Sequence, residues 1–164
     1  LAAELGLRFS FAGHFSPEGI AAMQLYRQLF KPSASLQRPY SMIGVPVVAA
    51  PTDAQAQYLA TTQQLKFLSL IRGNRLPLQA PVDSMDGLWN AWEEQAVRQK
   101  LAAAIVGGPQ TVKQGLEDLL ARTQADEIMM VSDFYEHADR LRSYEIVAAL
   151  KTAKTTPSEA ICTP

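Results

Sequence analysis

Short apolar runs alternate with longer amphipathic stretches along most of this chain. The apolar runs are rich in aromatic and β-branched residues and end at glycine, proline or aspartate, which is typical of buried strands. The stretches between them repeat apolar residues every three or four positions, which is typical of helices with one buried face. This pattern predicts four strands, at residues 7–12, 41–50, 104–106 and 127–132.

Each predicted strand is followed by at least one predicted helix. The helices are expected at residues 17–30, 52–71, 88–101, 109–120 and 136–150. Such alternation favours a parallel sheet with right-handed crossovers. Four β/α units make up half of a (β/α)8 barrel, and a four-stranded open sheet is the competing fold. Pro46 interrupts the second strand, so an edge position is the alternative to a buried central one.

Composition and charge narrow the classes of partner. The 164 residues suit one domain, and 15 basic against 16 acidic residues leave a formal net charge of −1. No basic field is available to attract nucleic acid or an anionic membrane, so we expect neither partner. One cysteine gives no disulfide framework and no cysteine-rich metal site, and we predict no metal. The sequence shows neither a signal peptide nor an apolar run of about 18 residues, which favours the cytoplasm.

The two ends of the chain carry expectations of their own. Leu1 is not a methionine, and residues 1–5 followed by Gly6 are typical of the last turns of a helix with a glycine cap. We therefore expect the chain to be the C-terminal part of a longer polypeptide. Residues 151–164 are rich in threonine, serine and proline, which predicts a disordered tail. Residues 1–150 would then form the partial barrel domain.

The turn at Gly107, Gly108 and Pro109 separates an apolar strand from a helix whose buried face begins at Val112. Two glycines allow a tight turn, and proline suits the first helical position. The free N–H groups at such a helix start favour an anion beyond the strand's carboxyl end. Glycine and proline also open many helices that bind nothing, so the spacing alone favours a plain structural connection.

Several other residues are candidates for chemistry. His14 follows the first strand, at the end where barrels keep their active sites, although a solvated turn histidine is the more frequent case. Arg72 and Arg75 lie in a long irregular segment and could clamp an anion with their forked guanidinium groups, or simply be solvated. Asp133 is expected to cap the last helix, since it directly follows the last strand.

Two aromatic residues and a set of missing motifs complete this inventory. Trp89 and Trp92 are three residues apart on one predicted helix, which favours core packing over a stacking platform. The sequence contains no Walker loop, no GxGxxG, no HExxH and no Ser-His-Asp order. Hydrolase, zinc protease and nucleotide-binding functions therefore have no support from motifs.

Four segments in this order resemble the C-terminal half of bacterial-luciferase-like, flavin-dependent monooxygenases. Residues 5–15 resemble the mid-barrel strand of that family, and residues 49–56 resemble its alanine, threonine-aspartate, alanine junction. Residues 107–112 resemble its glycine-serine-proline turn, with Gly108 in place of the usual serine, and residues 126–131 resemble its final barrel strand. The resemblance extends to about Leu150.

The resemblance implies a function, a cofactor and partners. Members of this family bind reduced FMN, which a separate flavin reductase supplies, and insert one atom of O2 into a small organic substrate. By position, Ala12, Gly13 and His14 become candidates for contact with the flavin. Weaker candidates for substrate or phosphate are Arg72, Arg75, Gly107 and Gly108. The resemblance assigns no catalytic residue, because the catalytic residues of the family precede this stretch, and we expect the chain alone to be inactive.

Two alternatives stay open beside the monooxygenase. One is a non-catalytic flavin-binding or interaction module on the same half barrel, and the other is a deazaflavin-dependent oxidoreductase. Four β/α units also leave two sheet edges and an apolar interior uncovered, which predicts self-association into a homo-oligomer.

Overall fold

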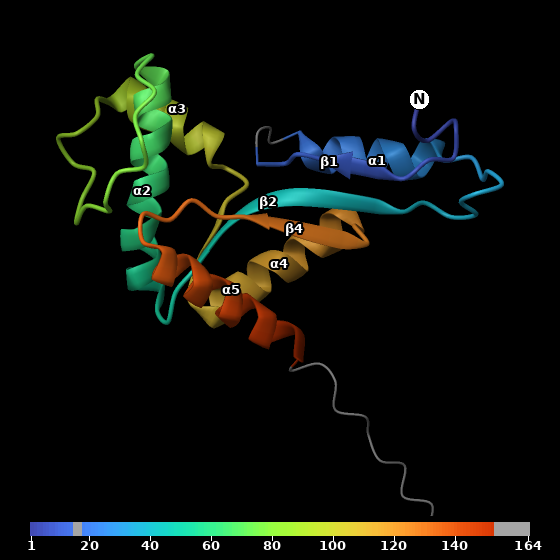
Figure 1. The fold of residues 1–164 in the computed structure, drawn as a ribbon. Helices are drawn as coiled ribbons and strands as arrows, with labels where there is room; N and C mark the ends of the chain where they lie inside the picture. Colours follow the sequence, from blue (N-terminus) through green and yellow to red (C-terminus); the bar gives the residue numbers. More distant parts are fainter. Residues whose placement is uncertain (15–17, 153–164) are drawn as a thin grey trace, which may run out of the picture.

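The computed structural model describes residues 1–14 and 18–152. Its nine helices and strands follow the predicted alternation (Figure 1). The strands are β1 (Phe9–Phe11), β2 (Ser41–Ala49), β3 (Ile105–Gly107) and β4 (Glu127–Val131). The helices are α1 (Gly19–Leu29), α2 (Asp53–Ile71), α3 (Ala91–Lys100), α4 (Pro109–Thr123) and α5 (His137–Thr152).

Strand β2 is the centre of the sheet, and all of its pairings are parallel. Strands β1 and β4 both pair with the beginning of β2, where they share Met42 and Ile43 as partners, so they lie on opposite edges. Strand β3 pairs with residues 47–49 at the carboxyl end. The sheet therefore does not run in sequential order, because β4 pairs with β2 rather than with β3.

Pro46 is in the middle of this central strand, so the alternative of an edge strand is wrong. It is the last residue of β2 that pairs with β4, opposite Val131, and pairing with β3 starts at the next residue. A proline cannot donate a ladder hydrogen bond. It is tolerated here because it lies where one partner strand ends and another begins.

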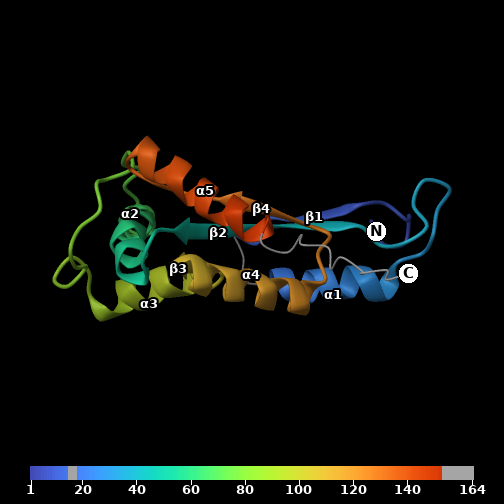
Figure 2. The ribbon, with the colours of Figure 1, turned by 90° about the horizontal axis from the view of Figure 1, so that it is seen from below.

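Strand β2 takes part in two hydrophobic cores, which involve different helices. In Figure 2, α1, α3 and α4 lie along one side of the sheet, α5 lies along the other, and α2 stands beyond the carboxyl end of β2. Odd-numbered residues of β2 share a core with α4 and α5: Val45, Val47, Ala49, Val112 and Ile146. Even-numbered residues share another core with α2 and the segment after β4: Val48, Ala50, Ala56, Leu59, Ala60 and Phe134.

Several helix boundaries differ from the predictions. Helix α3 begins at Ala91 rather than residue 88, because Asn90 and Glu93 form a reciprocal capping box. Helix α1 begins at Gly19, and the predicted start at residues 16–17 lies outside the described residues. Helix α5 continues to Thr152, two residues past the predicted boundary. The predicted disorder of the remaining tail also falls outside the described residues.

The free side of β4 opens onto an apolar groove of about 400 Å³ between α4 and α5. Leu120 and Tyr144 on its walls are more than one third exposed. Within residues 1–14 and 18–152, no helix combines the length and apolar character needed to cross a membrane, and no three His, Cys, Asp or Glu side chains gather as a metal site.

Candidate functional site

His14 lines a pocket of about 130 Å³ near the carboxyl ends of the strands. The other walls come from the middle of β2, the end of β4 and helix α2. Three of the lining side chains are apolar, Pro46, Phe67 and Val131, and three are polar, Gln63, Lys66 and Asp133. We call this the strand-end pocket. His14 therefore lies near the carboxyl-end edge of the parallel sheet, which is where many α/β folds bind their ligands.

An ion pair crosses the strand-end pocket. The Lys66 ammonium group lies 2.7 Å from the Asp133 carboxylate, and the two side chains are 36% and 19% exposed. The prediction that Asp133 caps the last helix is wrong, because α5 starts only at His137. The partial burial keeps this pair less screened than a surface ion pair.

The predicted flavin residues Ala12 and Gly13 precede His14 in a tightly packed turn. Gly13 is buried, and a Cβ atom placed on it would lie 2.6 Å from the carbonyl oxygen of Gly44. A Cβ atom on Gly44 would in turn lie 2.8 Å from Nδ1 of His14. Glycine at these two positions lets the end of β1 and the His14 ring approach the backbone of β2, whereas Ala12 is exposed.

The glycine turn before α4 meets the start of α2. The Gly108 N–H donates to Oδ1 of Asp53 over 2.6 Å. A Cβ atom on Gly107 would lie 2.5 Å from Thr111 and 2.7 Å from Asp53. Two of the segments that carry the family resemblance, at residues 49–56 and 107–112, therefore interlock through a carboxylate.

This carboxylate supplies the negative charge that the helix start favours. Hydrogen bonds from the Gly108 N–H and from the Thr111 side chain hold the pKa of Asp53 below its ordinary value. Asp53 thus occupies the N-terminal end of α4 where the sequence allowed an external anion. The turn and Asp53 therefore satisfy each other within the chain.

Arg72 and Arg75, the two arginines predicted to lie in the long irregular segment, are in a different part of the structure from Asp53. Nε and Nη2 of Arg72 donate to the two carboxylate oxygens of Glu93 over 2.7 and 2.9 Å, and Nη2 also donates to the Leu88 carbonyl. The pKa of Glu93 falls to about 2 because of the Arg72 hydrogen bonds and the N–H of Asn90. Arg72 thereby anchors α3 to α2. Arg75 is exposed in the irregular segment that follows.

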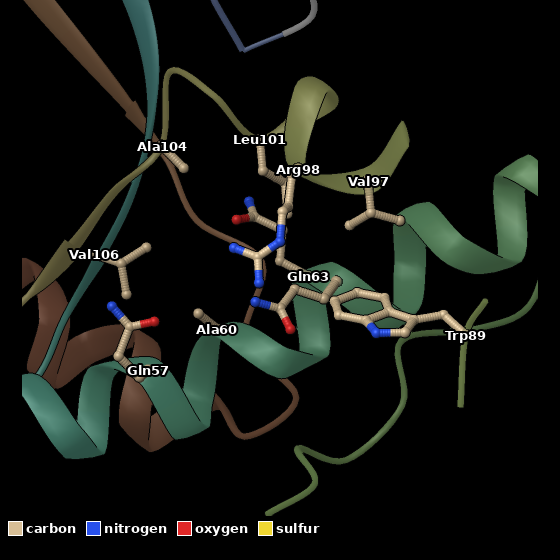
Figure 3. A pocket seen from close by; sticks show the side chains of 10 residues that line it. Gln57, Ala60, Gln63, Trp89, Val97, Arg98, Leu101, Ala104 and Val106 are labelled. Carbon is tan, nitrogen blue, oxygen red and sulfur yellow. The ribbon is translucent and has the colours of Figure 1, made fainter. Parts of the chain in front are cut away.

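A larger polar pocket was not predicted from the sequence. It measures about 310 Å³ and lies between α2, α3 and β3 (Figure 3). We call it the glutamine pocket, because three glutamines of α2 line it together with one arginine of α3. Its lining comprises Gln57, Ala60, Gln63, Gln64, Trp89, Val97, Arg98, Leu101, Ala104 and Val106. A helical period could have found Gln57 and Gln64, since residues seven apart share one helix face.

The tryptophan pair does not behave as predicted. Trp89 is partly buried and packs against Leu65, Leu68 and their neighbours, as expected of a core residue. Trp92 is 67% exposed, so its assignment to the core is wrong. The helix starts at Ala91, and Trp89 therefore lies before it rather than one turn away on the same face.

The chain is similar in sequence to several bacterial proteins. No family model matches it. It is 51% identical over 149 residues to the uncharacterized protein YvbT of Bacillus subtilis, covering 90% of this chain and 44% of YvbT. It is 41% identical over 152 residues to a luciferase-like monooxygenase of Escherichia coli K12, covering 92% of this chain and 45% of that protein. The chain thus spans less than half the length of these relatives.

Solved structures agree with the sequence relatives. The crystal structure of apo-MsnO8 matches with a TM-score of 0.75 and 28% identity, over 92% of this chain and 46% of MsnO8. The long-chain alkane monooxygenase LadA shares the fold at 15% identity with a TM-score of 0.57, over 93% of this chain and 38% of LadA. These matches confirm the predicted α/β fold as about half of a luciferase-like barrel. Over this shared stretch, the chain is similar in sequence and fold to luciferase-like monooxygenases.

Proposed function

We propose that this chain forms part of an FMN-dependent monooxygenase that oxygenates a small organic substrate. The observation that carries the proposal is the 41% identity to a luciferase-like monooxygenase over 92% of the chain. The oxygenating component of 3,6-diketocamphane monooxygenase, which shares this fold, was solved in complex with FMN. In such a reaction, reduced FMN supplies two electrons, one oxygen atom enters the substrate and the other leaves as water.

The strand-end pocket is the part of this chain that fits such a ligand best. It combines an imidazole, an ammonium group and a carboxylate with apolar walls from Pro46, Phe67 and Val131. Its volume of about 130 Å³ is below the roughly 300–1,000 Å³ that is usual for cofactor and drug-sized ligands. The residues therefore fit one wall of a flavin site rather than a complete one.

Individual roles follow from the chemistry of these side chains. His14 can hydrogen-bond a polar edge of the flavin ring, with Ala12 and Gly13 providing backbone contact. Lys66, which is paired with Asp133, places a positive charge in the strand-end pocket, where it would stabilise the electron-rich ring of reduced FMN. The Asp53 carboxylate closes the helix start behind Gly107 and Gly108, so we do not place the phosphate there. Arg75 stays a candidate for an anionic group, since it is exposed.

Titration of the chain with FMN, and anaerobically with reduced FMN, tests the proposal. We expect saturable binding followed by flavin fluorescence and absorbance, and weaker binding of several-fold in His14→Gln, because a neutral hydrogen bond contributes about 1 kcal/mol. The matched control is His137→Gln, since the protein has two histidines and His137 lies exposed on α5.

The outcomes separate the alternatives. Oxygen consumption dependent on reduced FMN and a substrate would support the monooxygenase, and binding of oxidised FMN without turnover would support the flavin-binding module. Preference for a reduced deazaflavin would support the third alternative. Equal weakening by the two histidine variants would contradict the placement of the flavin at His14.

The family resemblance also suggests the partners of the proposed enzyme. A flavin reductase would supply the reduced FMN, and the oxygenated product would leave as a small molecule. Self-association stays a prediction, and the exposed groove beside β4 is the surface of this chain on which it would rest.

A further inference from the structure

The glutamine pocket contains polar groups that the described chain does not use. Gln57, Gln63 and Gln64 bring three carboxamides from α2 to its walls, as Figure 3 shows for Gln57 and Gln63. Among residues 1–14 and 18–152, none of these three amides has a hydrogen-bond partner. Each carboxamide offers two donors and an acceptor, so the pocket presents a dense set of open hydrogen-bonding positions.

Gln63 is the most informative of the three. Its side chain is only 2% exposed, yet it borders both the glutamine pocket and the strand-end pocket. Buried polar groups in folded proteins nearly always have a partner, because an unsatisfied buried amide is unfavourable. Among the described residues, the Gln63 amide is not one of the buried polar atoms that lack a partner, so it faces the open space of the two pockets, where water or a ligand supplies its hydrogen bonds.

Arg98 adds a positive charge to the same space. Its guanidinium group extends from α3 between Gln57 and Gln63 in Figure 3. Nε donates to Oε1 of Glu94 over 2.8 Å, and Nη2 lies 2.7 Å from the same oxygen. Nη1 has no partner within the described ranges. The guanidinium fork thus keeps a free side that suits a carboxylate.

Apolar side chains complete the walls. Val97 is buried, Leu101 and Val106 are half-buried, and the Trp89 indole lies at one end of the pocket beside Gln63. An aromatic ring packs well against an indole. The volume of about 310 Å³ lies at the lower end of the range for small-molecule sites.

We propose that the glutamine pocket binds a small aromatic carboxylate. The carboxylate pairs with the free side of the Arg98 guanidinium, the ring packs against Trp89, and polar substituents on the ring bond the amides of Gln63 and Gln64. This site shares Gln63 with the strand-end pocket, but it does not depend on the proposed monooxygenase activity.

Calorimetric titration of the full chain with 4-hydroxybenzoate, in the absence of any flavin, tests this site. We expect saturable binding of one molecule and weaker binding of its neutral analogue, 4-hydroxybenzyl alcohol. Arg98→Gln should weaken binding by about tenfold or more, because a hydrogen-bonded charge is lost. Lys100→Gln, which removes an equal charge from an exposed position of the same helix, should leave the affinity within about twofold.

A second readout locates the ligand. In a ¹⁵N-labelled sample, the indole N–H signal of Trp89 and the Gln63 amide signals should shift on binding, and Trp92→Phe identifies the Trp89 signal because the protein has two tryptophans. Gln64→Leu should weaken binding even if Arg98→Gln perturbs folding. The proposal is overturned by absent saturation, by equal losses in Arg98→Gln and Lys100→Gln, or by shifts confined to Trp92. Because no flavin is present, such a failure would leave the monooxygenase proposal untouched.

Discussion

Two polar regions along helix α2 differ in how the protein satisfies them. At the start of the helix, Asp53 accepts from Gly108, and Thr52 accepts from the Gln55 N–H, so local groups satisfy one another. Almost three turns further along, the Gln63 amide has no hydrogen-bond partner in the described part of the chain and faces the pockets instead. The first region binds its own chain and the second is available to a ligand. Polar residues near strand ends therefore indicate a site only when the fold leaves their hydrogen bonds open.

The stability of the protein should be more sensitive to an added side chain at the first region, where the glycine turn meets Asp53. Gly107→Ala would place a Cβ atom 2.5 Å from the Thr111 side chain and 2.7 Å from the Asp53 carboxylate. The close atoms belong to the Thr111 side chain and the Asp53 carboxylate, so we expect a loss of about 1–3 kcal/mol in the free energy of unfolding, measured by urea denaturation.

Gly108 provides the matched control. Its own Cβ atom would meet neighbours at 3.4 Å and beyond, in ordinary contact, and its φ of −72° suits any residue. Gly108→Ala should therefore change the unfolding free energy by less than about 0.5 kcal/mol. Equal losses in the two variants would refute the close approach of Gly107 to Asp53.

The neighbouring pair Thr62 and Gln63 compares a satisfied with an open polar side chain. Thr62 is 1% exposed and donates to the Gln79 carbonyl over 2.9 Å. Thr62→Val should lose about 1 kcal/mol of stability, because the carbonyl is left without its donor. Gln63→Leu should be neutral or stabilising by up to about 1 kcal/mol, because an unpartnered amide is removed.

Thermal and urea unfolding of the two variants measure this difference. A clear loss of stability in Gln63→Leu would show that Gln63 is satisfied within the fold, and the glutamine pocket would then lose its main argument. A neutral Thr62→Val would show that its hydrogen bond to Gln79 contributes little.

The smallest effect concerns the pH dependence of the Arg72–Glu93 pair. The pKa of Glu93 lies at about 2 in the folded protein and at 4.5 ordinarily, because Arg72 and the Asn90 N–H bond its carboxylate. Its contribution to stability is therefore present above pH 4.5 and is lost as the pH falls towards 2. Glu93→Gln should flatten the decline of stability between pH 5 and pH 2.

Unfolding midpoints across this pH range test that expectation. Glu145→Gln is the comparison, because its 3.1 Å pair with Arg142 has side chains 65% and 61% exposed and is screened by solvent. An unchanged slope in Glu93→Gln would contradict the shifted pKa.

Much of the fold could be predicted from local pattern. The run of apolar residues in β2 and the Thr52 N-cap of α2 are sequence signals with a direct physical cause. The pairing of β4 with β2 was not predictable, since it depends on contacts between residues about 85 positions apart, such as the Ser41 N–H on Asp126. Asn90 and Glu93 have the spacing of a capping box in the sequence, and this spacing would have placed the start of α3 at Ala91 rather than at residue 88.

The candidate sites were less predictable than the fold. His14 could be placed at the strand ends because it follows a strand directly. Arg72 and Arg98 look alike in sequence, and only their neighbours in space distinguish them. Glu93 occupies the fork of Arg72 on two sides, whereas Glu94 leaves one side of Arg98 open to a pocket. That difference arises from the packing of α3 on α2, which no local pattern encodes.

The change of partner at Pro46 has a consequence for how the chain is made. Residues 42–45 of β2 have one edge that only β4 covers, while residues 47–49 need β3. On a ribosome, the first half of β2 emerges long before β4 and keeps an unpaired edge until nearly the whole described chain has been synthesised. The nascent chain therefore exposes this apolar strand while the residues between β2 and β4 are synthesised, which makes β2 a segment that a chaperone would have to protect.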